Sequence, residues 1–213
     1  MIRRMLVLSL FLFTLSVATS AFGGKKEVKL TPIVGRLDLK PLVPMLNKGE
    51  VTLVESYRSG KLRQVTIVGL VKATPTKVWD VLTDYEHYLK FMPSLVEVEI
   101  TKKQGADTII TYELEVPGIN MDYSLRHHHE PKSRIDISLA DDEGDITTGA
   151  WRWDLVPHEN GTQTMLIYSL YTDVSESSWF IRQALKSQPS MEHGLNIASG
   201  LVTLQAIKKK AEK

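Results

Sequence analysis

Three consecutive histidines, His127 to His129, are the residues of this chain whose type and spacing most suggest chemistry. They follow Tyr123 and Leu125 in a stretch that alternates apolar and polar residues, which is typical of a β-strand. Successive strand side chains point to opposite faces, so His127 and His129 share the face of Tyr123 while His128 points away. Imidazoles gathered on one face could bind a metal ion or transfer protons.

A metal site is the less favoured of these two interpretations. Only two of the three neighbouring histidines converge, whereas protein zinc sites use three or four ligands. The other histidines, His87, His158 and His193, are far apart in the sequence, and the chain has no cysteine. We therefore predict neither a metal site nor a cofactor.

Acid–base catalysis would use His127, His129, Tyr112 and Tyr123, because imidazole and phenol groups near a substrate can transfer protons. A covalent mechanism would also need a nucleophile beside a base that a third group orients. We identify no such set in the sequence. We therefore predict a binding site without catalytic residues and keep an acid–base enzyme as an alternative.

Apolar and aromatic side chains recur on one face of the predicted strands, and they would line the same space as these histidines. A cavity lined by such side chains with a few polar tips suits a large apolar ligand. The same side chains could also form a filled core. The strand residues that we predict to contact a ligand are Tyr112, Tyr123, Leu125, His127, His129, Trp151 and Trp153.

A long helix is predicted for the C-terminal segment after a break at 187–190, where Pro189 interrupts the pattern. Met191, Leu195, Ala198 and Val202 recur at steps of three and four residues, which places them on one helix face. We expect this face to pack over the concave side of a sheet. Its small side chains would leave room for a ligand, so we include these four residues in the predicted site.

The remaining elements must form the sheet that holds these residues. Thr74 and Pro75 are a strong helix start, and we expect Asp84 to cap a second short helix that ends at Pro93. Short turns separate the predicted strands, which favours an antiparallel meander. The predicted strands are 51–57, 64–73, 95–101, 108–116, 119–129, 134–139, 148–156 and 164–174, after a short helix at 37–46.

The segment from Val71 to Pro93 resembles the polyketide cyclase/dehydrase and coenzyme-Q-binding branch of the START-like (SRPBCC) superfamily. The residues that carry the resemblance are Ala73, Pro75, Val78, Trp79, Leu82, Asp84, Tyr85, Phe91 and Pro93. The resemblance extends over residues 64–213. It implies an α+β helix-grip fold, in which a curved antiparallel sheet wraps around a long C-terminal helix and two short helices follow the first core strand. It also implies a cavity for a lipid, quinone or polycyclic ligand.

Composition and charge are those of an ordinary globular protein. The chain has 213 residues, 43% hydrophobic, with 26 basic and 25 acidic side chains, so nothing favours a nucleic-acid partner. Arg3 and Arg4, an apolar stretch and small residues before Ala21 form a secretory signal pattern. We predict a signal peptide at 1–21, an N-terminal extension at 22–63 and a ligand-binding domain at 64–213.

Three functions follow as hypotheses from these observations. The favoured one is a periplasmic or secreted carrier of a hydrophobic small molecule or lipid. The lysines at 208–210 could also give it a transient contact with a membrane. The alternatives are an aromatase/cyclase-type enzyme and a ligand-free periplasmic adaptor.

Overall fold

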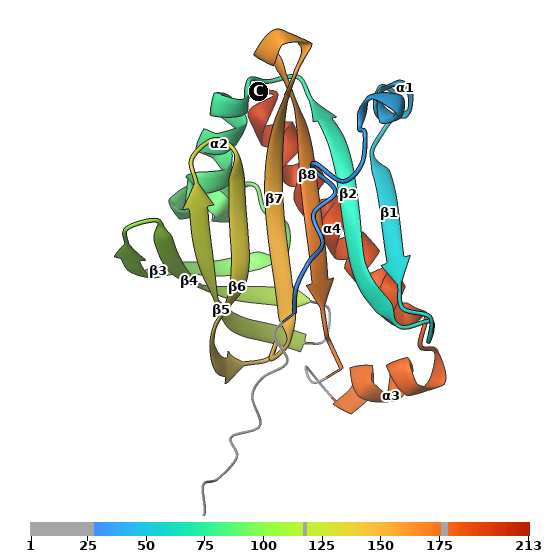
Figure 1. The fold of residues 1–213 in the computed structure, drawn as a ribbon. Helices are drawn as coiled ribbons and strands as arrows, with labels where there is room; N and C mark the ends of the chain where they lie inside the picture. The colour runs from blue at the N-terminus through green and yellow to red at the C-terminus, as the bar shows by residue number, and fades with distance from the viewer. Residues whose placement is uncertain (1–27, 117–118, 176–178) are drawn as a thin grey trace, which may run out of the picture.

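A computed structural model describes residues 28–116, 119–175 and 179–213, and the predicted signal peptide lies outside them. Eight strands form one antiparallel sheet in the order β1-β2-β8-β7-β6-β5-β4-β3 (Figure 1). The strands are β1 (Val51–Ser56), β2 (Leu62–Val71), β3 (Leu95–Gln104), β4 (Asp107–Val116), β5 (Ile119–Glu130), β6 (Arg134–Gly144), β7 (Gly149–His158) and β8 (Gln163–Thr172). The helices are η1 (Lys40–Leu42), α1 (Val43–Leu46), α2 (Pro75–Thr83), η2 (Tyr85–Lys90), η3 (Glu159–Gly161), α3 (Trp179–Ser187) and α4 (Met191–Ala211).

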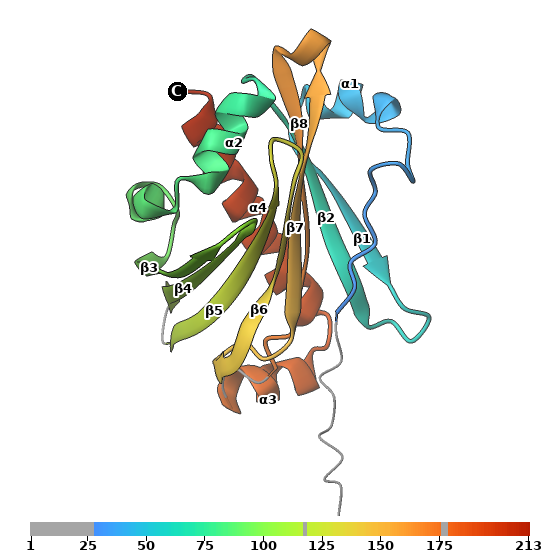
Figure 2. The ribbon, with the colours of Figure 1, turned by 60° about the vertical axis from the view of Figure 1, so that its left-hand side comes forward.

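The predicted α+β helix-grip fold is confirmed. Helix α4 lies along one face of the curved sheet, and the N-terminal segment runs over the opposite face (Figures 1 and 2). We call the face beneath α4 the inner face and the other one the outer face. Within the described residues, no helix is long and apolar enough to cross a membrane.

The start of α2 follows from its sequence. The hydroxyl of Thr74 accepts a hydrogen bond from the backbone N–H of Lys77 at 3.3 Å, and Pro75 occupies the first turn. Val78 and Leu82 are the buried side chains of this helix, whereas Trp79 is only half-buried. Trp79 of the family motif therefore packs at the edge of the core.

Asp84 does not cap η2, contrary to the sequence-based expectation. The first turn of η2 has no side-chain cap, and the Asp84 carboxylate instead accepts a 2.6 Å hydrogen bond from Nδ1 of His87. The helix is a 3₁₀ helix, whose tighter winding places these two residues near each other. A second difference is β6, which continues to Gly144, whereas the predicted strand ends at residue 139.

Helix α4 approaches the sheet closely at Gly200. A Cβ atom there would lie 2.5 Å from Cδ1 of Ile67 and 2.8 Å from Cδ2 of Leu170, so no larger residue fits without a shift of the core. Further along, Leu204 packs over Gly69 of β2. The small residue thus permits tight packing and leaves no void beneath it.

The outer face of the sheet has a second apolar cluster, which the N-terminal segment completes. Its buried members are Ile33, Leu46, Val68, Leu70, Met165 and Ile167. Alternate residues of β8 therefore contribute to cores on both faces, which explains why this strand is apolar throughout. Because β1 pairs with β2, residues of the predicted extension form an edge strand of the same sheet.

Candidate functional site

The inner face gathers most of the strand residues predicted for the site. Tyr112, Leu125, His127, Trp151 and Trp153 are each at most 7% exposed, and all except His127 belong to the main hydrophobic cluster. They meet there because strands β4, β5 and β7 direct alternate side chains to the same face. Tyr123 and His129 are half-buried.

A continuous chain of hydrogen bonds joins both inward histidines to two tyrosines. Tyr112 Oη lies 3.1 Å from His127 Nε2, and His127 Nδ1 lies 3.3 Å from Tyr85 Oη. Tyr85 Oη is also 2.8 Å from His129 Nε2. His129 Nδ1 lies 2.8 Å from the carbonyl oxygen of Ala106. We call this set of four side chains the His–Tyr chain.

The carbonyl at one end determines the direction of every bond in the His–Tyr chain. A carbonyl only accepts, so His129 Nδ1 carries a proton and its Nε2 accepts from the Tyr85 hydroxyl. Having donated its one proton, Tyr85 accepts from His127 Nδ1–H. The Nε2 of His127 then accepts from the Tyr112 hydroxyl. Each group makes the bonds that its neutral form allows, so this buried polar network is fully satisfied.

Burial keeps all four groups neutral near pH 7. Desolvation, together with the nearby His129, lowers the pKa of His127 to about 3. Desolvation also lowers the pKa of His129 and raises the pKa values of Tyr85 and Tyr112. The His–Tyr chain therefore supplies oriented dipoles to the inner face without a net charge.

This arrangement suits hydrogen bonding better than proton transfer. A base whose conjugate acid has a pKa of about 3 is far from the value near 7 that favours general base catalysis. Both ring nitrogens of His127 are also occupied by tyrosines. Among the described residues, no cluster of three or more histidine, cysteine, aspartate or glutamate side chains is placed to hold a metal ion.

Half-buried apolar side chains pack against the buried part of the inner face, and we call this set the rim. It includes Tyr123, which packs on Tyr112 with ring centroids 6.0 Å apart. Other members come from β3, β6, β8 and α4 and from the residue that follows η2. They are Leu95, Val98, Ile100, Leu139, Tyr171, Phe91, Ile197 and Leu201. An apolar ligand would therefore contact the rim, since the residues beneath it are already closely packed.

The expected orientation of α4 was wrong. Met191, Leu195 and Val202 are 37%, 40% and 47% exposed, and Ala198 is exposed as well. The buried residues of this helix are Asn196, Gly200, Leu204, Ile207 and Ala211. Apolar residues occur all around α4, so their spacing alone did not identify the face that contacts the sheet.

Sequence analysis missed Tyr85, although it is the residue that links the two histidines. It was assigned only to a short structural helix within the family motif. Its ring also packs edge-on against His127, with centroids 5.0 Å apart, and Trp79 packs edge-on against His129. A tyrosine separated from His127 by 42 positions leaves no local signal of this contact.

Comparison with known proteins identifies the family of this chain. Residues 71–187 match the family described as polyketide cyclase / dehydrase and lipid transport. This span exceeds half of the chain, so the protein belongs to that family, as the motif around Trp79 predicted. A search of curated protein sequences found no match.

Solved structures show the same fold at low sequence identity. The Zhui aromatase/cyclase from Streptomyces sp. R1128 is 17% identical, with a TM-score of 0.55 over 70% of this chain and 93% of its own. A STAR-related lipid transfer protein from Xanthomonas axonopodis is 17% identical, with a TM-score of 0.57 over 78% of this chain and 95% of its own. TTHA0849 from Thermus thermophilus is 15% identical, with a TM-score of 0.57 over 70% of this chain and 96% of its own. At these identities the likeness concerns the fold alone.

Proposed function

We propose that this protein carries a hydrophobic ligand, a lipid, quinone or polycyclic compound, against the inner face of its sheet. The observation that carries the proposal is the neutral, fully bonded His–Tyr chain beside a half-buried apolar rim. Burial of apolar surface against the rim would contribute favourable binding free energy to an apolar ligand. The ligand would need no charged protein group beside it. Family membership and the fold shared with a lipid transfer protein support the same assignment.

Tyr123 is the polar group best placed to meet such a ligand. It stands half-buried on the rim next to Tyr112, and its hydroxyl makes no hydrogen bond to any residue that the structure describes. A carbonyl or hydroxyl on the ligand would pair with this free phenol. The apolar remainder of the ligand would lie along Val98 and Leu95 of β3.

Mass spectrometry of organic extracts from the purified full chain tests the proposal. A co-purifying lipid or quinone supports the carrier. An empty protein with catalytic turnover would favour the aromatase/cyclase-type enzyme, and an empty inactive one the adaptor. Replacing Tyr123 by leucine should weaken binding of the extracted compound by about tenfold, the equivalent of one hydrogen bond. Ala198→Phe is the matched control, because Ala198 is exposed and should leave binding unchanged.

The carrier is also proposed to be exported and to touch membranes transiently. Export rests on the signal pattern before Ala21, and N-terminal sequencing of the protein from its native cell would test it. A full-length, membrane-extracted chain would contradict this part of the proposal.

The membrane contact rests on the solvent side of α4. At 100° per residue, Lys209 falls on the same side as the exposed Met191, Leu195 and Val202. Lysines also border a groove of about 240 Å³ at the C-terminal end of this helix. Its lining residues are Lys90, Phe91, Ala206, Lys209, Lys210 and Lys213. Apolar side chains followed by lysines complement a surface of anionic lipids, where each lysine contributes about 1 kcal/mol.

Vesicle sedimentation distinguishes this contact from unspecific adhesion. Vesicles with phosphatidylglycerol should bind the protein, and vesicles of phosphatidylcholine alone should not. Changing Lys209, Lys210 and Lys213 to glutamine should abolish binding. Changing Lys102 and Lys103, two exposed lysines of β3, should have little effect. Equal binding of both variants would refute the assigned surface.

A further inference from the structure

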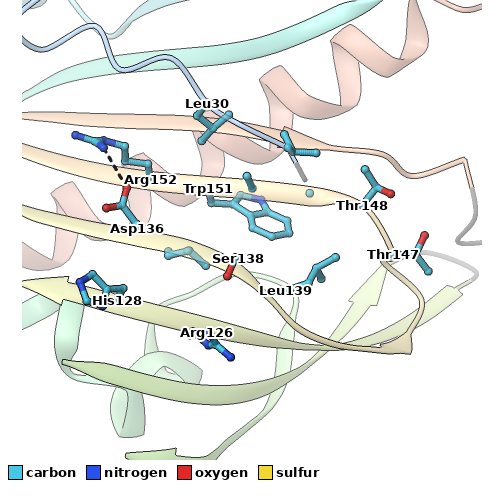
Figure 3. A pocket seen from close by; sticks show the side chains of 14 residues that line it. Leu30, Arg126, His128, Asp136, Ser138, Leu139, Thr147, Thr148, Trp151 and Arg152 are labelled. Atoms are coloured by element: carbon cyan, nitrogen blue, oxygen red, sulfur yellow. Dashed lines mark hydrogen bonds and ion pairs between the residues drawn. The ribbon is translucent and has the colours of Figure 1, made fainter. Parts of the chain in front are cut away.

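A cavity of about 480 Å³ lies on the outer face, opposite the His–Tyr chain (Figure 3). It lies between the N-terminal segment at Val28 and Leu30 and strands β5, β6 and β7, and it is open to solvent. Its volume is within the range of small-molecule sites. We call it the outer cavity.

The floor of the outer cavity is apolar because two strands separate there. Strands β6 and β7 pair from Arg134–Asp154 to Ser138–Ala150, and their paired register ends at that point. Trp151 and Leu139 line the cavity beside this opening. The Trp151 ring lies against Gly149, where a Cβ atom would be 2.5 Å from the ring, so only glycine accommodates this ring position without a shift.

The roof of the cavity is anchored to the sheet. Gln64 is fully buried, accepts a hydrogen bond from the Thr31 backbone N–H at 2.7 Å and donates one to the Thr31 carbonyl at 2.9 Å. Arg63 donates to the Thr31 hydroxyl at 2.7 Å. These bonds fix the segment next to Leu30, which lines the cavity together with Trp151 (Figure 3).

Arg126 is the cationic residue of the outer cavity that has no partner among the described residues. Asp136 is paired with Arg134 and Arg152, and Arg152 is also paired with Asp154. Arg126 makes no ion pair or hydrogen bond with any described residue. Its register neighbour Ser138 and the nearby Thr148 likewise have unpaired side-chain hydroxyls within the described chain. Free donors therefore lie beside the apolar floor, while the nearby carboxylates are neutralised.

We propose that the outer cavity is a second binding site, for a small amphipathic carboxylate. The carboxylate would accept hydrogen bonds from the Arg126 guanidinium and the Ser138 hydroxyl, since guanidinium groups match carboxylates in geometry and charge. The aliphatic or aromatic body of the ligand would lie between Leu30 and the floor formed by Leu139 and Trp151. Leu139 and Trp151 also pack in the inner-face cluster, but the polar contacts of the two sites differ, so either assignment can fail without the other.

Calorimetric titration with octanoate, and with the uncharged octanamide for comparison, tests the proposal on the full chain. We expect saturable binding of octanoate that is about tenfold or more tighter than that of octanamide, and that weakens with added salt. Arg126→Gln should remove this preference. Arg58→Gln changes an exposed arginine of the turn between β1 and β2 and should retain it. Ser138→Phe should block both ligands by filling the cavity from an exposed position.

Amide shifts in NMR spectra locate the bound octanoate. Shifts at Leu30, Ser138 and Thr148 would support the outer cavity. Thermal unfolding would check that all three variants are folded. Shifts confined to inner-face residues such as Tyr123 would overturn it. So would the absence of saturable binding, or octanoate binding that is the same in Arg126→Gln and the unchanged protein.

Discussion

Replacing Tyr85 by phenylalanine removes one oxygen atom from the centre of the His–Tyr chain. The ring remains, so its packing against Tyr88 and His127 is preserved. The hydroxyl is both the acceptor for His127 Nδ1–H and the donor to His129 Nε2. After the change, His129 can turn to water because it is half-buried, whereas one nitrogen of the buried His127 loses its partner.

An unsatisfied buried polar group destabilises the folded state by about 1–3 kcal/mol. In a domain of this size the loss corresponds to a decrease of about 2–12 °C in the melting temperature. Urea denaturation of both proteins at pH 7 would measure the free energy of unfolding. Long-range proton–nitrogen NMR correlations would report the histidine tautomers, and we expect the Nδ1–H form for both His127 and His129 in the unchanged protein.

Tyr168→Phe is the matched control for this experiment. Tyr168 is buried and stacks on Trp153 with ring centroids 4.0 Å apart, but its hydroxyl has no hydrogen-bond partner among the described residues. Its loss should change stability by less than about 0.5 kcal/mol. Equal effects of the two substitutions, or an Nε2–H tautomer for His129, would refute the reasoning about the His–Tyr chain.

Two further predictions concern α4 and pH. Gly194→Ala should stabilise the protein by about 0.5–1 kcal/mol, because alanine favours a helix and no atom lies within 4 Å of the new Cβ. Gly200→Ala should instead destabilise it by about 1–3 kcal/mol through contact with the packed sheet, and urea denaturation would reveal opposite signs. The pKa of His127 is about 3 in the folded protein, against an ordinary value of 6.5, so the unfolded chain binds an extra proton between these values. Stability should thus fall as pH decreases through this range, and His127→Gln should reduce the slope by about 1.4 kcal/mol per pH unit; identical slopes would contradict a buried neutral His127.

Much of the fold was predictable because its signals are local. Alternation along the strands identified which histidines point inward, and Thr74 with Pro75 marked the start of α2. The sequence of β8 is apolar on both faces and did not identify an inward face, and only the structure shows the N-terminal segment that covers its outer side. The family motif around Trp79 then connected these elements to the helix-grip architecture.

Tertiary packing decided the rest. Apolar residues occur on all sides of α4, so the sequence did not show which face of the helix meets the sheet. Close packing at Gly200 determines that face. Tyr85 joins His127 and His129 only because η2 folds back over β5, which no local pattern encodes. The outer cavity exists where β6 and β7 part beneath Leu30. Local alternation determines which way a side chain points along its own strand, but its partners depend on segments that are distant in sequence and meet only in the folded chain.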